Sequence, residues 1–199
     1  MSAIILRGGV EVENPLELTL EFLAAYPGEA DGSVSAESFD ESDLRFANRG
    51  GARISAVEIE AILERRDQIE RALRKVPSGA SLADSTSSIP WIPLTVLFDA
   101  FADIRGVGFS KMTKALYMKR PALIPILDSV VQTYLETDDP GKRSSGSFGE
   151  RAIELVRSYK RELDRNRSVL HEVQRELASR TYRLTEVRIL DLVIWSVCR

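Results

Sequence analysis

The chain has 199 residues, of which 44% are hydrophobic and 29% are charged, and its formal net charge at pH 7 is −3. This composition predicts a globular protein with a buried core. It excludes a protein that coats nucleic acid through its total charge, so any such binding needs a local basic patch. The single cysteine, Cys198, excludes an internal disulfide and a cysteine-based metal site, and the single histidine, His171, argues against a histidine-rich metal site or a Ser-His-Asp triad.

The sequence also bears on membranes and targeting. No apolar stretch reaches the ~18 residues needed to span a bilayer. The N-terminal apolar run is too short for a secretory signal, and acidic residues follow it. We therefore predict a cytoplasmic protein with no membrane partner, and nothing in the sequence indicates a cofactor or a metal site. An oligomeric state is not predicted.

The first predicted elements are a small hairpin and a helix. Ile4–Leu6 and Val10–Val12 flank a Gly-Gly pair, which can form a two-residue turn with positive φ. Asn14 then caps a helix that begins at Pro15, because proline suits the first helical turn, where its missing N–H is not needed.

Two more helices are predicted before residue 77. Asp40 is placed to cap the first. Ser55 caps the second, and Glu58, three residues later, completes a capping box. An apolar stripe extends from Ile59 to Val76, so we predict that the second helix continues to Val76 with this stripe buried.

Three polar stretches separate the predicted helices. Residues 28–38 and 137–147 are predicted loops, and residues 77–90 form a polar connector. The connector is the best candidate for an internal boundary, but the pieces on either side of it are too small to be separate domains. We therefore predict a single domain over residues 1–199.

The second half of the chain is helical throughout. Residues 91–104 are apolar on nearly all sides, which predicts a buried helix. Residues 148–177 predict a long helix with one polar residue, Asn166, in its apolar seam; this helix either packs on the domain or joins a partner helix in a short coiled coil. The helix that Thr185 caps is almost wholly apolar and belongs in the core. The predicted fold is all-α, with a small N-terminal β-hairpin.

The stretch "IRGVGFSKMTKALYMKRPALIPILDS", from Ile104 to Ser129, carries several basic residues and no carboxylate before Asp128. Gly106 and Gly108 lie between two predicted helices, and the second of these starts near Phe109. Glycines allow a tight turn, and the N–H groups at the helix start point the same way, which is an arrangement that binds phosphate oxygens.

The cations around this turn strengthen the hypothesis. Lys111 and Lys114 share one face of the helix, and further basic residues flank it. The alternative is a core helix whose cations form a solvated face. The predicted nucleic-acid contacts are Arg105, Gly106, Val107, Gly108, Ser110, Lys111, Lys114, Lys119 and Arg120.

The segment from Trp91 to Leu135 resembles the helix-hairpin-helix motif. In that motif a buried apolar residue sits between two glycines, as Val107 does, and the hairpin holds the sugar-phosphate backbone without reading base sequence. The run "IPILDS" extends the resemblance to the helix-hairpin-helix DNA glycosylase superfamily. The resemblance implies that Asp128 is a catalytic carboxylate and Lys111 a Schiff-base lysine.

Two departures weaken the likeness to the glycosylases. Asp128 lies three residues after Pro125, where the superfamily usually has two, and Lys111 is offset by one from the lysine of bifunctional members, with Ser110 at the matching position. Asp128 is also well placed to cap the helix that follows it. Three stretches, "DLRFANRGGARIS", "KRPALIPILDSVV" and "VRILDLVIW", resemble a group of actinobacterial proteins, the domain-of-unknown-function class 6308, which implies relatives but no activity.

Three functions remain open from the sequence. The first is binding of a nucleic-acid backbone, DNA above all, through the glycine turn. The second is a base-excision enzyme of DNA glycosylase type that uses Asp128. The third is a helical interaction or structural protein whose turn is purely structural. The turn amides and the cations beside them distinguish these functions, because the first two need them accessible.

Overall fold

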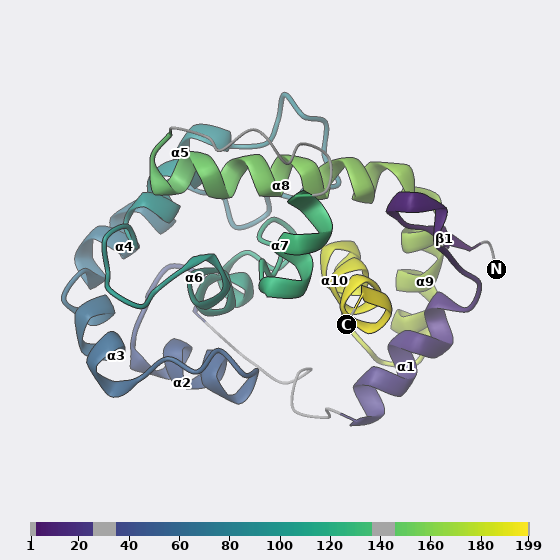
Figure 1. Cartoon of the computed structure of the whole chain (residues 1–199), viewed down its shortest axis with the longest axis horizontal. Helices are drawn as coiled ribbons and strands as arrows, with labels where there is room; N and C mark the ends of the chain where they lie inside the picture. Colours follow the sequence, from purple (N-terminus) through teal and green to yellow (C-terminus); the bar gives the residue numbers. More distant parts are fainter. Residues whose placement is uncertain (1–2, 26–34, 137–145, 199) are drawn as a thin grey trace.

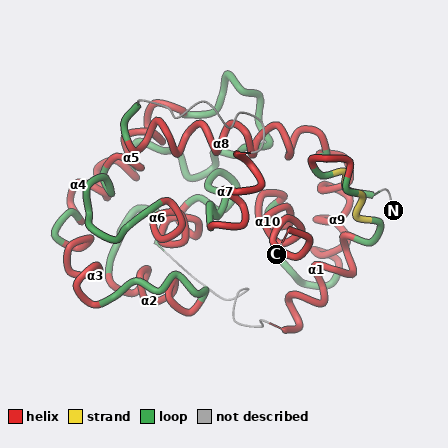
Figure 2. The backbone as a smooth tube through the Cα atoms, viewed as in Figure 1, coloured by secondary structure: helices red, strands yellow, loops and turns green. Residues whose placement is uncertain are grey.

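The computed structural model describes residues 3–25, 35–136 and 146–198, and these residues form a helical protein with one short sheet (Figure 1). The predicted all-α fold with a small N-terminal β-hairpin is confirmed, and Figure 2 shows strand only in that hairpin. The elements are β1 (Ile4–Ile5), η1 (Arg7–Gly9), β2 (Glu11–Val12), α1 (Pro15–Ala25), α2 (Glu41–Arg49), α3 (Ala56–Leu63), α4 (Arg66–Leu73), α5 (Trp91–Asp99), α6 (Phe109–Leu116), η3 (Tyr117–Lys119), α7 (Ser129–Glu136), α8 (Phe148–Arg165), α9 (Arg167–Ser179) and α10 (Glu186–Cys198).

The predicted N-terminal β-hairpin forms, but its turn contains the three residues of η1 and not only the Gly-Gly pair, because Leu6 N donates to Val10 O at 2.9 Å. β1 and β2 pair antiparallel, with Ile4 opposite Val12. Gly8 and Gly9 have φ values of 72° and 77°, in the left-handed region that glycine adopts without strain. The Gly-Gly pair therefore supplies the positive-φ residues of the turn, and the two apolar strand residues are buried in the core.

Both predicted caps are present, and each forms a capping box, although the sequence predicts a box only at Ser55. At the start of α2, Asp40 Oδ1 accepts from Ser42 N at 2.8 Å and Asp43 Oδ2 accepts from Asp40 N at 2.8 Å. At the start of α3, Ser55 Oγ accepts from Glu58 N, and Glu58 Oε2 accepts from Ser55 N at 2.7 Å. Each box satisfies backbone donors that a helix start leaves without partners.

Two helices that the sequence predicts as continuous are broken, so the prediction of their length was wrong. Between α3 and α4 the chain turns at Arg65, whose guanidinium Nη1 donates to Ala102 O at 2.5 Å. Between α8 and α9 it turns at Asn166, whose side chain accepts from Ile5 N at 2.7 Å and donates to Ile5 O at 3.0 Å. In both places a polar side chain leaves the helix surface to satisfy backbone groups of a distant segment.

The long helix α8 runs along one edge of the molecule, and the other helices pack below it (Figure 1). Its main contacts are with α5 and α7, while α10 contacts α7, α9 and α1 near the centre. The residues of α10 from Ile189 to Ile194 are buried without interruption, which confirms that the last helix belongs to the core. On the opposite side, α2 packs against α6, the helix that follows the glycine turn.

The polar stretches differ in how much of each is described. The connector at 77–90 is fixed through Leu82, which is fully buried, donates to Ala122 O at 2.8 Å and accepts from Lys160 Nζ at 3.0 Å. The predicted loops at 28–38 and 137–147 lie mostly outside the described residues. Among the helices of the described ranges, none has the length and apolar character needed to cross a membrane.

Candidate nucleic-acid interface

The glycine turn and the first turns of α6, residues 104–114, are called the α6 hairpin from here on. Gly106 has a φ of +83°, and Val107 N donates to Ile104 O at 3.0 Å, which closes the turn. Ile104 and Val107 are each only 6% exposed. The predicted buried apolar residue between two glycines is therefore present, and it anchors the turn in the core.

The first amides of α6 are open to a ligand. Gly108 is the N-cap residue and has no side chain with which to cap the helix. Within the described part of the chain, the N–H groups of Gly108, Phe109 and Ser110 have no hydrogen-bond acceptor. Gly108 is exposed, and the two residues after it are half-buried. Free N–H groups and the helix dipole give this end of α6 a partial positive charge, which suits an anion.

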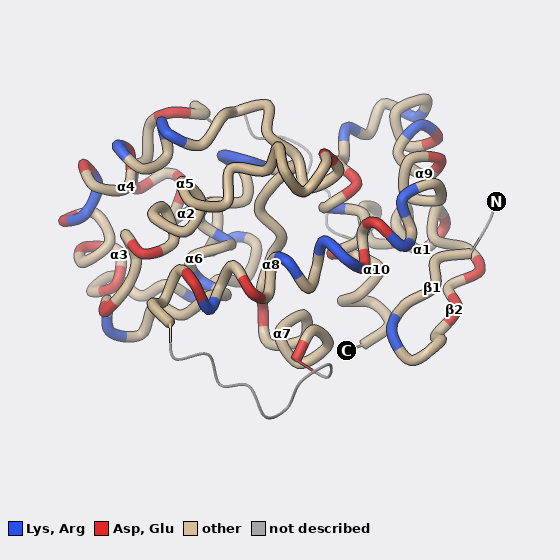
Figure 3. The backbone as a smooth tube through the Cα atoms, turned by 90° about the horizontal axis from the view of Figure 1, so that it is seen from above, with Lys and Arg blue, Asp and Glu red and all other residues tan. Residues whose placement is uncertain are grey.

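Three of the predicted cations lie on or beside the α6 hairpin. Arg105 is exposed. Lys111 Nζ lies 2.6 Å from Glu58 Oε1, and Lys114 Nζ donates to Gly50 O at 3.2 Å and to Gly51 O at 3.4 Å. Figure 3 shows that basic and acidic residues are interspersed along the helices.

Lys119 and Arg120 lie in the interior. Lys119 is 3% exposed and its Nζ is 2.6 Å from Asp43 Oδ1. Arg120 is 2% exposed, and its guanidinium donates to Val76 O and Leu73 O at 2.8 Å each. Burial lowers the pKa of Arg120. Neither side chain reaches the surface, because Lys119 pairs with a carboxylate at the start of α2 and Arg120 donates to carbonyls at the end of α4. Neither residue is therefore available to a ligand at the α6 hairpin.

Asp128 caps α7. Its Oδ1 accepts from Val131 N at 3.0 Å, and its carbonyl accepts from Gln132 N at 2.8 Å. The preceding residue is tied to α6, because Leu127 N donates to Thr113 Oγ1 at 3.0 Å. The capping interpretation of Asp128 is confirmed, and this geometry gives no independent support to a catalytic carboxylate.

Asp191 lies on α10, near Asp128, and its spacing from Arg188 predicts an internal ion pair between the two. It is 4% exposed; its Oδ2 accepts from Ile126 N at 3.1 Å and lies 3.9 Å from Arg188 Nη1, while its Oδ1 has no partner among the described residues. Burial raises the pKa of Asp191 to about 7; the Arg188 guanidinium opposes this rise, and the Asp128 carboxylate adds to it.

This carboxyl group makes stability depend on pH. From about pH 4 to about pH 7 the folded chain keeps a proton on Asp191 that the unfolded chain has lost, so the contribution of this group to stability falls as pH rises through that window. The variant Asp191→Asn stays neutral at every pH. We expect its free energy of unfolding, relative to the unchanged protein, to rise by about 2 kcal/mol between about pH 5 and about pH 8. Urea denaturation at several pH values measures this difference, and a difference that does not vary with pH contradicts the assignment.

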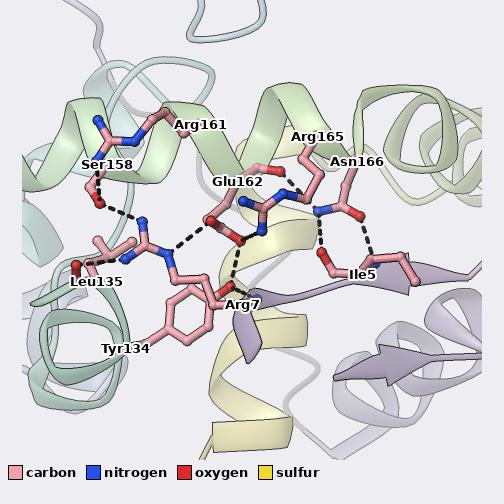
Figure 4. A network of polar contacts seen from close by, with 9 residues as sticks. All are labelled: Ile5, Arg7, Tyr134, Leu135, Ser158, Arg161, Glu162, Arg165 and Asn166. Atoms are coloured by element: carbon pink, nitrogen blue, oxygen red, sulfur yellow. Dashed lines mark hydrogen bonds and ion pairs between the residues drawn. The ribbon is translucent and has the colours of Figure 1, made fainter. Parts of the chain in front are cut away.

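A buried polar network joins the N-terminal β-hairpin to α7 and α8 (Figure 4). Glu162 is fully buried, its Oε1 accepts from Arg7 Nε at 2.9 Å, and its Oε2 accepts from Tyr134 Oη at 2.6 Å. The same guanidinium donates to Leu135 O at 2.8 Å and to Ser158 Oγ at 2.6 Å. Sequence reasoning missed this network, because its members are far apart in the chain and no local pattern links them.

Two depressions of the surface stand out, and neither is lined by the α6 hairpin. The larger has a volume of about 600 Å³ and contains the pair of His171 Nδ1 and Glu186 Oε1, 3.1 Å apart. In the described ranges, no group of three or more His, Cys, Asp or Glu side chains is placed to hold a metal ion. The larger depression is lined by Asp164, Arg165, Arg167, Ser168, His171 and Glu186.

Comparison with known proteins gives a family but no activity. No curated protein and no solved structure matches the chain. A family model described as "Family of unknown function (DUF6308)" matches residues 19–198. The match names neither a reaction nor a source organism, so the likeness to helix-hairpin-helix proteins stays a prediction. Because the match covers most of the chain, including the α6 hairpin, the protein belongs to the family of unknown function DUF6308.

Proposed function

We propose that the protein binds the phosphate backbone of DNA through the α6 hairpin, without reading base sequence. The observation that carries this proposal is the set of open amides at Gly108, Phe109 and Ser110, beside the exposed Arg105. A phosphate oxygen placed there receives hydrogen bonds from the helix start and interacts favourably with its dipole.

The surroundings of the α6 hairpin support the same ligand. Lys114 lies one helical turn after Ser110 on α6, and its ammonium group donates to the carbonyls of Gly50 and Gly51. This places the loop between α2 and α3 beside α6, and Arg49, the last residue of α2, and Arg53 of that loop are exposed. Cations from two segments therefore lie near α6, with Lys114 in its last turn. Such a patch binds backbone phosphates of any sequence, and its affinity falls with salt.

The first experiment measures binding of a fluorescent random-sequence DNA duplex by anisotropy. We expect binding at about 50 mM salt that weakens strongly by about 200 mM, because counterions are released when phosphates are neutralised. Arg105→Gln and Lys114→Gln should each weaken binding about three- to tenfold and reduce the slope of log K against log salt by about one.

The matched control is Arg175→Gln, which removes the same charge from an exposed position on α9. It should change affinity by less than about twofold, because it lies outside the proposed contact. The proposal is wrong if the unchanged protein binds no duplex at low salt, or if Arg105→Gln and Lys114→Gln behave as the control does. A single-stranded DNA of the same length, tested in parallel, shows whether duplex geometry matters.

A further inference from the structure

The α6 hairpin already contains an anion supplied by the chain itself. Glu58 Oε1 lies 2.6 Å from Lys111 Nζ, and the carboxylate rests directly on Gly106. A Cβ built on Gly106 would stand 2.2 Å from Glu58 Oε1, so only glycine leaves room for the carboxylate at this place. Glu58 thus occupies the side of the glycine turn on which Lys111 lies.

Two sets of contacts fix this carboxylate. Its Oε2 accepts from Ser55 N at 2.7 Å and from Ser55 Oγ at 3.0 Å, while its Oε1 accepts from Lys111 Nζ. The side chain of Glu58 is only 12% exposed. Burial opposes its ionisation, but the hydrogen bonds from Lys111 and Ser55 outweigh burial and hold the pKa of Glu58 below its ordinary value. The group is therefore a charged carboxylate over the physiological range.

We infer that Glu58 is a built-in competitor for the phosphate: it neutralises Lys111 while no nucleic acid is bound, and it must release this lysine before Lys111 can contact the backbone. This inference rests on the proposed function. While the carboxylate neutralises it, this ammonium group does not neutralise a phosphate, so it releases no counterion from the DNA and adds little to affinity. The carboxylate also repels the incoming phosphate, since both are anions at close range.

The variant Glu58→Gln tests this directly. Glutamine at the third helical position still completes a capping box, so the start of α3 is retained while the charge is removed. We expect duplex binding about tenfold tighter at low salt, and a slope of log K against log salt that is steeper by about one, since Lys111 becomes an additional phosphate contact. The matched control is Glu60→Gln on the same helix, where the glutamate is exposed. It changes the net charge equally and should alter affinity by less than about twofold.

A double-mutant cycle shows whether Glu58 acts through Lys111. In a Lys111→Gln background, Glu58→Gln should tighten binding clearly less than the roughly tenfold expected with Lys111 present, because only the repulsion between carboxylate and phosphate is then relieved and no lysine is released. Urea denaturation of each variant establishes that the protein remains folded.

The outcomes separate this inference from the proposal on which it rests. If neither the unchanged protein nor Glu58→Gln binds duplex at low salt, both fail. If the unchanged protein binds, and Arg105→Gln weakens it, but Glu58→Gln behaves like Glu60→Gln, only the competitor inference fails. A gain that is undiminished in the Lys111→Gln background also overturns it, because Glu58 would then act only through its own charge and not through the lysine. Tighter binding that depends on Lys111 supports both.

Discussion

Replacing Glu162 with glutamine lowers the free energy of unfolding by about 3 kcal/mol, because it removes the buried carboxylate that pairs with the guanidinium of Arg7. The Glu162 carboxylate is fully buried, and the side chain of its partner Arg7 is 10% exposed, so water replaces little of the lost interaction. Burial also raises the pKa of Tyr134, whose hydroxyl donates to this carboxylate. Urea denaturation at pH 7 measures the change as a lower midpoint with an unchanged slope.

The control for this prediction is Glu154→Gln, an exposed glutamate two turns earlier on α8. It should change the unfolding free energy by no more than about 0.5 kcal/mol. Arg7→Met completes a double-mutant cycle with Glu162→Gln, and the double variant should be less destabilised than the sum of the two single variants. Equal midpoints for the Glu162 and Glu154 variants would show that the network does not stabilise the fold.

Replacing Arg120 with methionine has an effect of similar size, about 4 kcal/mol. The guanidinium donates to Val76 O and Leu73 O at 2.8 Å, to Ala36 O at 2.6 Å and to Lys119 O at 2.7 Å. Methionine fills much of the same volume but donates nothing, so carbonyls at the end of α4 lose their partner. Each buried acceptor left unpaired costs about 1–3 kcal/mol.

A lysine at position 120 shows how much of the stabilisation comes from the positive charge and how much from the shape of the guanidinium. Arg120→Lys keeps the cation but lacks the planar fork that reaches several carbonyls at once, so it should recover only part of the stability. Arg105→Met, at an exposed arginine fifteen residues earlier, removes the same charge and should stay within about 0.5 kcal/mol of the unchanged protein. The interpretation of Arg120 as a brace between helix ends is wrong if both methionine variants unfold at the same urea concentration.

The sequence predicts the features of this fold that depend on neighbouring residues. The cap at Asp40 and the capping box of Ser55 and Glu58 follow from short stretches of sequence, and the position of the β-hairpin turn follows from a Gly-Gly pair. The start of α6 and the buried Val107 are equally local. In each case one short stretch of chain contains all the groups that decide the geometry.

Features that depend on distant segments could not be predicted. The apolar seam continues through Asn166, so the pattern favours one long helix, but the partner that bends the chain there is Ile5, 161 positions away. Lys119 and Arg120 belong to a basic run that could equally well face solvent. Their burial follows from Asp43 and from carbonyls of other helices, which no sequence spacing reveals. Glu58 was recognised as a cap, but its contact with Lys111 joins segments that only the fold brings together.

Only one member of the buried pair of Arg7 and Glu162 lies in the segment that the family model matches. Glu162 lies inside the segment that the family model matches, residues 19–198, whereas Arg7 lies before it. Natural variation should therefore couple the two positions: a member of the family that lacks this arginine is expected to carry an uncharged side chain in place of the glutamate. A shortened chain that starts at Asn14 lacks Arg7. A peptide of the first thirteen residues, added to this chain, should restore the chain's stability, because it supplies the arginine that pairs with Glu162.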